Sequence, residues 1–101
     1  MEEELLSLEI TEPARIAYTA LGPEDRRVVS AWFDHLRNWR NDEFIRSKSR
    51  QLKSDTETYV FQTSADIVIA FKIAGNTVVV SSIFRKEAIR KFETVLERTV
   101  P

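Results

Sequence analysis

Two adjacent cations, Arg85 and Lys86, are the residues of this sequence best placed to do chemistry. They end the stretch DIVIAFKIAGNTVVVSSIFRK (66–86), in which two apolar runs are joined by Gly75-Asn76. A guanidinium and an ammonium can hold a phosphate or an acidic partner, but alone they supply no general base. We therefore expect the two cations to bind rather than to catalyse, and Arg85 is the one candidate for a catalytic residue. The alternative is that they merely begin the next helix.

Arg50 and Lys53 are two further candidates for contact with nucleic acid or another target. They belong to a basic segment, residues 26–53, which holds eight cations against three acids, a net charge of +5. Residues 1–25 hold seven acids against one cation, a net charge of −6, and the whole chain carries −1. A basic middle can attract a phosphate backbone through counterion release. A solvated helix face followed by a solvated loop is the alternative.

Other kinds of site find little support in the sequence. His35 is the only histidine. It lies on a predicted helix, where we expect it to belong to the apolar stripe of that helix or to the boundary of the stripe, rather than to act as a base. Ser30 and Asp34 can share a helix face, but no second histidine completes a nucleophile relay. With no cysteine and scattered carboxylates, we expect no metal site. Two glycines cannot form a phosphate loop or a dinucleotide fingerprint, so we expect no cofactor.

Composition predicts one packed domain over residues 1–101. The chain is 43% hydrophobic and 31% charged, which is typical of a globular protein. The absence of cysteine suits a reducing compartment, and the first residues, MEEELLSLEI, are acidic where a signal peptide is basic. No run approaches the roughly 20 apolar residues that span a bilayer. We expect a cytoplasmic protein with no membrane partner.

The first half of the chain predicts a strand followed by two helices. Residues 5–10 form a short apolar run, and Thr11 is a plausible N-cap for a helix that ends near Ala20. Gly22-Pro23 separates it from a second helix, which is expected to run from Glu24 to Asn41-Asp42. An apolar stripe on this second helix is predicted from the three- and four-residue spacing of Val28, Ala31 or Trp32, His35 or Leu36, and Trp39.

The second half predicts three strands and a final helix. Residues 43–57 are polar and basic, with Phe44, Ile45 and Leu52 as expected anchors. Alternation then predicts strands at 58–63, 66–73 and 77–84, and helical spacing returns over 86–98. The order strand-helix-helix-strand-strand-strand-helix predicts an α+β domain, with a helical hairpin packed on a mainly antiparallel four-stranded sheet. We expect burial of four residues on these apolar stripes: Trp32, Ile69, Phe71 and Phe92.

This order and these segments resemble the RelE/ParE toxin superfamily of bacterial type II toxin–antitoxin modules. LEITEPARIAYTALGPEDRR resembles the first strand and helical hairpin of that family, and RSKSRQL its basic segment. TYVFQTSADIVIAFKIAGNTVVVSSIFRKEAIRKF resembles its three-strand meander and terminal element. The resemblance implies a toxin neutralised by a cognate antitoxin protein, with the ribosome and its mRNA or DNA gyrase as the target.

The sequence departs from the ribonucleases of that family at most of their functional positions. Val60 and Gln62 replace two basic residues, Val68 replaces an arginine, and Phe92 stands near the position of a late tyrosine. Only Arg85 and Lys86 agree with the family pattern. Cleavage of mRNA by the usual residues is therefore not expected, whereas the ParE-like gyrase poisons lack that catalytic set. A degenerate interaction module and a nuclease with atypical residues stay open as alternatives.

Overall fold

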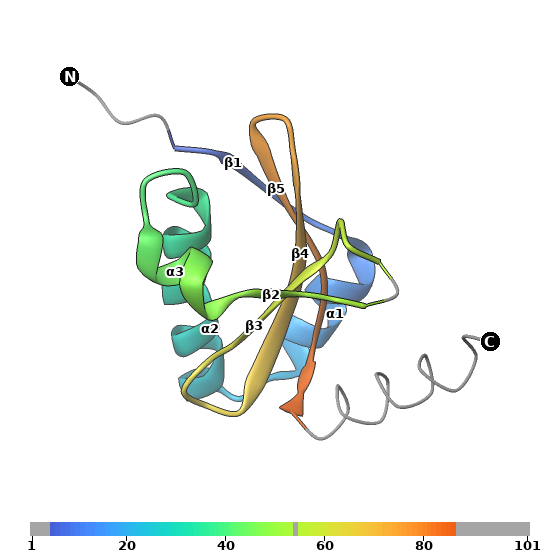
Figure 1. The fold of residues 1–101 in the computed structure, drawn as a ribbon. Helices are drawn as coiled ribbons and strands as arrows, with labels where there is room; N and C mark the ends of the chain where they lie inside the picture. Colours follow the sequence, from blue (N-terminus) through green and yellow to red (C-terminus); the bar gives the residue numbers. More distant parts are fainter. Residues whose placement is uncertain (1–4, 54, 87–101) are drawn as a thin grey trace.

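The fold was analysed in a computed structural model, which describes residues 5–53 and 55–86 (Figure 1). Two helices follow the first strand, and a short third helix precedes the remaining strands, which confirms the expected α+β class. In chain order the elements are β1 (Ser7–Ile10), α1 (Glu12–Ala20), α2 (Pro23–Arg37), α3 (Glu43–Lys48), β2 (Arg50–Gln51), β3 (Tyr59–Gln62), β4 (Ile67–Ala74) and β5 (Thr77–Arg85).

The starts of α1 and α2 agree with the sequence prediction. The Thr11 hydroxyl accepts a hydrogen bond from the Ala14 amide at 3.4 Å and donates one to the Ser81 carbonyl at 3.0 Å, so this N-cap also ties α1 to β5. Gly22 caps α2, and Pro23 occupies its first turn, where the missing amide proton costs nothing.

The end of α2 differs from the prediction, and its buried stripe agrees with the prediction only in part, at Leu36. The helix ends at Arg37 rather than near Asn41-Asp42, because the Asn38 amide closes the last turn onto the His35 and Leu36 carbonyls and Asp42 begins α3. The buried residues of α2 are Val29, Phe33 and Leu36, while Ala31 and His35 are exposed and Trp32 is half-buried. A shift of one position suffices to rotate the stripe, because neighbouring helix residues differ by about 100°.

Within the described residues the sheet has five strands in the order β1-β5-β4-β3-β2, one more than predicted. β1 pairs with β5 in parallel, and the other neighbours are antiparallel. Gly75 has φ of 60° in the turn between β4 and β5, a conformation that glycine adopts without steric cost. The additional strand, β2, is two residues long, too short to produce an alternating pattern in the sequence.

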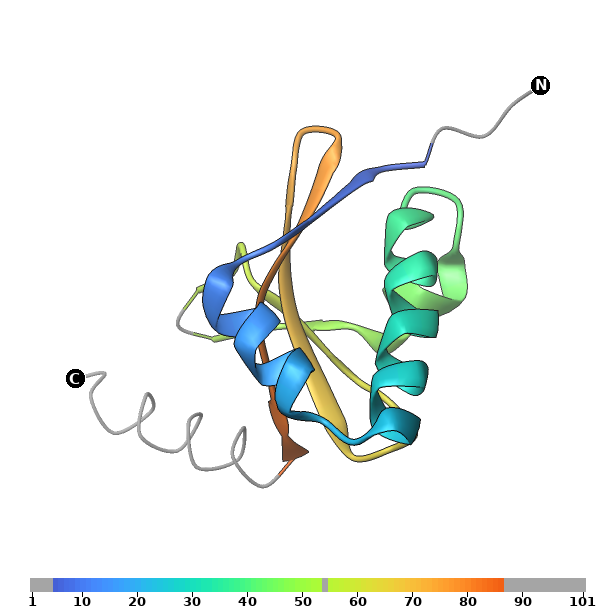
Figure 2. The same ribbon diagram turned by 180° about the vertical axis from the view of Figure 1, so that it is seen from behind.

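Two apolar clusters cover the two faces of the sheet. α1 and α2 lie on the same face, as Figure 2 shows from behind. The larger cluster lies between these helices and the sheet, and it includes Ala14, Val29, Phe33, Ile69 and Phe71. We call the opposite side of the sheet the far face. Its smaller cluster consists of Leu52, Val60, Val68 and Ala70, with Phe84 packed against it.

The four residues expected in the core have different outcomes. Ile69 and Phe71 are both fully buried, as predicted. Trp32 is only half-buried at the margin of the larger cluster, because it stands at the edge of the α2 stripe. Phe92 and the final helix expected over 86–98 lie outside the described residues, apart from Lys86. None of the helices in the described part of the chain is long and apolar enough to cross a bilayer.

Truncation of Phe71 should strongly destabilise the protein. Its ring is fully buried and lies 5.5 Å from Trp39 and 5.7 Å from Tyr59 between ring centroids, so an alanine would leave a cavity in a close-packed core. We expect Phe71→Ala to lower the free energy of unfolding by about 3–5 kcal/mol, measured by equilibrium denaturation. Phe44→Ala is the matched control, since Phe44 is 52% exposed. Equal losses in the two variants would contradict the assigned core.

Candidate functional site

Arg85 is the last residue of β5, the strand that ends near the bottom of Figure 1, and Lys86 follows it in the chain. Both residues are exposed. Arg85 pairs with Ile67 across β4, so its side chain lies on the helix side of the sheet, where its guanidinium is 3.4 Å from the Asp25 carboxylate at the start of α2. The Lys86 amide donates to the Asp66 carbonyl at 2.9 Å. The side chain of Arg85, the last residue of β5, thus contacts the helical layer and does not point to the far face.

The far face carries valines at two of the positions where the resembled ribonucleases have cations, and the exposed Gln62 stands at a third. Val60 lies opposite Ala70, and Val68 lies between Gln62 and Phe84 in the strand register. Val60 and Val68 are both buried. This part of the sheet therefore offers packing rather than charge. Lys72, the β4 cation on the same face, lies 3.6 Å from the Asp55 carboxylate.

The four candidate cations do not form one site. Arg50 belongs to β2 and Lys53 follows it, whereas Arg85 ends β5, and β3 and β4 separate those two strands in the sheet. Arg50 lies opposite Val60, so it is placed at the margin of the far face. Arg50 and Lys53 are both exposed. Arg85 and Lys86 therefore form one cationic position at the end of β5, and Arg50 and Lys53 form another at β2.

Several arginines of the basic segment stabilise the fold by donating to backbone carbonyls. Arg46 donates to the carbonyls of Trp39 and Arg40, both at 2.7 Å, and these groups lie in the turn that follows α2. Arg37 reaches the Leu6 carbonyl at 2.9 Å. Two further donors of this kind are Arg26, which bonds to the carbonyls of Leu21 and Thr19, and Arg40, which bonds to that of Gly75. Part of the +5 charge is therefore used to satisfy carbonyls at helix ends and turns.

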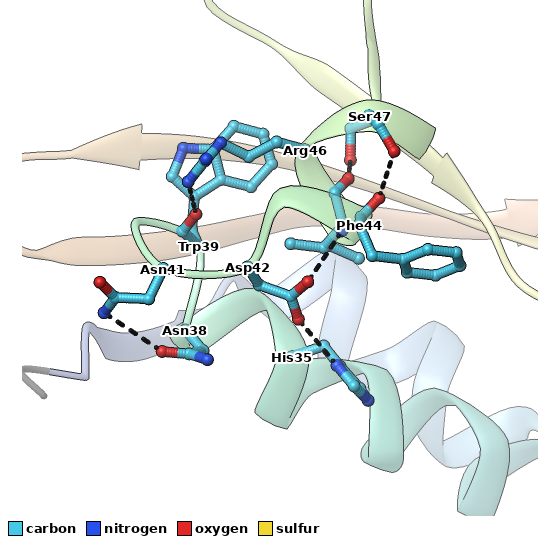
Figure 3. Close-up of polar contacts among 10 residues, drawn as sticks. His35, Asn38, Trp39, Asn41, Asp42, Phe44, Arg46 and Ser47 are labelled. Carbon is cyan, nitrogen blue, oxygen red and sulfur yellow. Dashed lines mark hydrogen bonds and ion pairs between the residues drawn. The ribbon is translucent and has the colours of Figure 1, made fainter.

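His35 and Asp42 connect the end of α2 to the start of α3 (Figure 3). The Nδ1 atom of His35 lies 3.1 Å from Oδ2 of Asp42, and Oδ1 of Asp42 accepts from the Ile45 amide at 3.1 Å. Asp42 is thus the N-cap of α3. The hydrogen bond with His35, followed by that from Ile45, holds the pKa of Asp42 below its ordinary value of 3.8. The sequence pattern had assigned Asp42 only to the end of α2.

Aromatic rings lie beside this junction. The Trp32 and Phe44 rings are nearly parallel, with centroids 6.2 Å apart, and Trp32 also contacts His35 and Phe61 at 4.7 Å each. The Lys48 ammonium lies 5.8 Å from the Phe44 ring centroid. Ile45 and Leu52 are buried as expected, but Phe44 is 52% exposed and does not anchor the segment. A helix of six residues can direct only part of its surface inward, and Ile45 takes that position.

A shallow hollow of about 270 Å³ adjoins the same junction. Its lining consists of Leu5, Asp34, His35 and Asn38. These four side chains include one imidazole but no hydroxyl or thiol, so they do not form a Ser-His or Cys-His relay. Within residues 5–53 and 55–86, no group of three His, Cys, Asp or Glu side chains is placed to hold a metal ion.

The chain has the fold of the RelE and ParE toxins. A chain of the toxin–antitoxin complex RelBE2 from Mycobacterium tuberculosis superposes with a TM-score of 0.67 at 16% identity, over 80% of this chain and 98% of that one. The isolated RelE toxin of E. coli gives 0.66 at 14% identity, over 94% and 99%. A chain of the chromosomal ParDE system of P. aeruginosa gives 0.59 at 14% identity, over 81% and 97%. No protein-family model and no curated protein matches by sequence.

Loss of the Asp42 side chain should destabilise the α2–α3 junction in a pH-dependent way. Asp42→Ala removes both the N-cap and the partner of His35, and we expect a loss of about 1 kcal/mol in unfolding free energy at neutral pH. Because the folded-state pKa of Asp42 is depressed, its charge stabilises the fold above pH 3.8, and this contribution disappears as the pH falls through the lower folded value.

Denaturant titrations at neutral and acidic pH measure this effect. The gap between wild type and Asp42→Ala should narrow below pH 3.8, and Asp42→Asn, which keeps an acceptor oxygen, should lose less than the alanine variant. Asp34→Ala is a suitable control, because Asp34 is an exposed acid on α2 that caps no helix. A gap that stays constant across the pH range would show that the carboxylate charge contributes nothing.

Proposed function

We propose that this protein is the toxin component of a type II toxin–antitoxin pair, which arrests growth by binding its target and is held inactive by a cognate antitoxin. The proposal depends on one observation: the fold matches both the RelE and the ParE branch over most of the chain. The matches cover between 80% and 94% of this chain, so they concern the whole architecture rather than one motif.

We propose binding rather than RNA cleavage as the mode of action. Val60 and Val68 are packed beneath Leu52 and Phe84, so the described residues bring no cluster of cations to the centre of the far face that would stabilise charge developing on a phosphate. Arg85 lies on the helix side beside Asp25, away from this cluster. A guanidinium whose described neighbour is the ion-paired Asp25 carboxylate supports recognition of a phosphate or carboxylate group rather than cleavage.

The proposed target is either the translation machinery or DNA gyrase, reached in the cytoplasm. The apolar far face favours the gyrase branch, since the resembled gyrase poisons do not need the ribonuclease residues. The same observation favours the second candidate function, a non-enzymatic interaction module that has kept the fold without toxicity. A growth assay separates a toxin from such an interaction module.

The proposed partner is an antitoxin that attaches through an extended or helical segment. Two of the comparison structures are toxin–antitoxin complexes, RelBE2 and ParDE. This chain offers two sheet edges, β1 and β2, whose outward backbone groups could pair with an added strand. β2 is only two residues long, so β1, with four residues, is the better edge for such pairing.

Expression of the protein alone in a bacterial host is the direct test. We expect growth to stop and to resume when the cognate antitoxin is co-expressed. Measurement of DNA integrity and of transcript ends then distinguishes gyrase poisoning from arrest of translation. Normal growth, with folded protein accumulating in the cells, would contradict the toxin proposal and favour the interaction module. Discrete RNA cleavage that Arg85→Ala abolishes would restore the nuclease alternative.

Arg85 and Lys86 should contribute to target binding and little to stability. The double variant Arg85→Ala, Lys86→Ala should bind an anionic target more weakly and with a flatter salt dependence, because fewer counterions are released. Both residues are exposed, so unfolding free energy should change by no more than about 0.5 kcal/mol. Arg15→Ala is a matched control, since Arg15 is also exposed and lies 3.8 Å from Glu12. A large loss of stability, or undiminished binding, would contradict this role.

A further inference from the structure

Phe44 is an exposed aromatic residue that the fold does not require. Ile45 provides the fully buried contact of α3. Asp42 caps the start of this helix and Ser49 caps its end, each with a hydrogen bond. The Phe44 side chain is 52% exposed, and in Figure 3 its ring extends outward from α3, away from Asp42. An apolar ring of this size in water stabilises nothing by its exposed surface. Packing of the core therefore does not explain why an aromatic residue stands at position 44.

The surroundings of Phe44 combine stacked rings with a cation. Trp32, itself half-buried, lies nearly parallel to it at 19°, and Trp32 is fixed from below by the buried Phe61. Lys48, one helical turn after Phe44, places its ammonium 5.8 Å from the ring centroid. We call Trp32, Phe44 and Lys48 the aromatic platform. It lies on the helical part of the molecule, separate from Arg85 and from the far face.

We propose that the aromatic platform stacks an unpaired nucleobase of a single-stranded nucleic acid, with Lys48 contacting the adjoining phosphate. An exposed ring held rigidly by a second ring is the surface on which bases stack, and a nearby cation supplies the contact with the backbone. Lys48 is an exposed, flexible side chain that can move off the ring when a base arrives.

Charge and size favour a nucleobase over a protein partner. Lys48 brings a positive charge to the platform itself, which suits the phosphate next to a stacked base. Two rings cover far less than the roughly 800 Å² per partner of a stable protein interface. The neighbouring exposed side chains of α2 and α3, Asp34, Glu43 and Ser47, are polar and do not extend the apolar surface.

Fluorescence anisotropy with a labelled single strand of about ten nucleotides, at about 50 mM salt, tests the proposal with the full chain. RNA and DNA versions of the strand are compared, since both present the base and phosphate that the platform recognises. Phe44→Ala should weaken binding about 5- to 150-fold, the range expected for the loss of one stacked base. Phe44→Tyr should keep nearly wild-type affinity, whereas Phe44→Leu should behave like the alanine variant, because leucine keeps the apolar bulk without the ring.

Three controls separate stacking from general attraction. Ile16→Ala removes another exposed apolar side chain, 60% exposed on α1, and should leave binding unchanged. An abasic strand should bind wild type and Phe44→Ala equally, since it keeps the phosphates but offers no base. Lys48→Ala should reduce the slope of log affinity against log salt by about 0.7, the value for one phosphate of a single strand.

Two results would overturn the proposal. The first is unchanged affinity of Phe44→Ala or Phe44→Leu for a strand that wild type binds. The second is the absence of binding to either strand at low salt by a protein whose thermal unfolding confirms that it is folded, which would leave a protein partner as the occupant of the platform. The outcome is independent of the growth assay, because the platform lies apart from Arg85 and Lys86 and the toxin proposal does not depend on it.

Discussion

Burial of β4 on both faces is the constraint on which the rest of the structure depends. Five consecutive residues of this strand, Ile67–Phe71, are buried, alternating between the helix-side core and the far-face cluster. A strand covered on both sides must be apolar throughout, because an unpaired charge in either layer would cost several kcal/mol. The positions of Val68 and Ala70 therefore serve packing, and they cannot also carry the cations of a phosphate-cleaving site.

The same constraint explains why the charged residues lie at the periphery. With the sheet centre apolar, cations remain at strand ends, in turns and on helices, where many of them donate to carbonyls that the helices leave unsatisfied. Arg46 illustrates this role, since its two contacts hold the turn between α2 and α3 in place. A net charge counted along a segment therefore overstates the charge available to a ligand, since several of its members already have backbone partners.

Fold and chemistry are separable in this protein. The architecture of RelE and ParE toxins is present over most of the chain, yet the far face is packed with Val60, Val68 and Leu52. A scaffold tolerates such replacement because its stability depends on the helix-side core, whereas function depends on a few side chains at its surface. The proposed activity therefore depends on what the periphery binds: the end of β5 for the target, and the α2–α3 surface for an unpaired base.

Local patterns in the sequence were sufficient for the class of fold, the order of its main elements and the start of both long helices. Alternation marked β3, β4 and β5, Thr11 and Gly22-Pro23 marked the helix starts, and the order of elements indicated the toxin-like architecture. These features depend on residues close together in the chain, so they can be read without knowing what the chain packs against. Ile69 and Phe71 were correctly placed in the core for the same reason.

Contacts between distant residues decided the rest. The parallel pairing of β1 with β5 joins segments about seventy residues apart, and β2 exists only because β3 lies beside it. Whether Phe44 was buried or exposed depended on which side of α3 met the sheet, and Ile45 took the inner place. Arg85 and Lys86 are neighbours in sequence, but register with Ile67 placed the Arg85 side chain beside Asp25. Spacing along a chain sets which residues can share a face, whereas only packing selects the face that is covered.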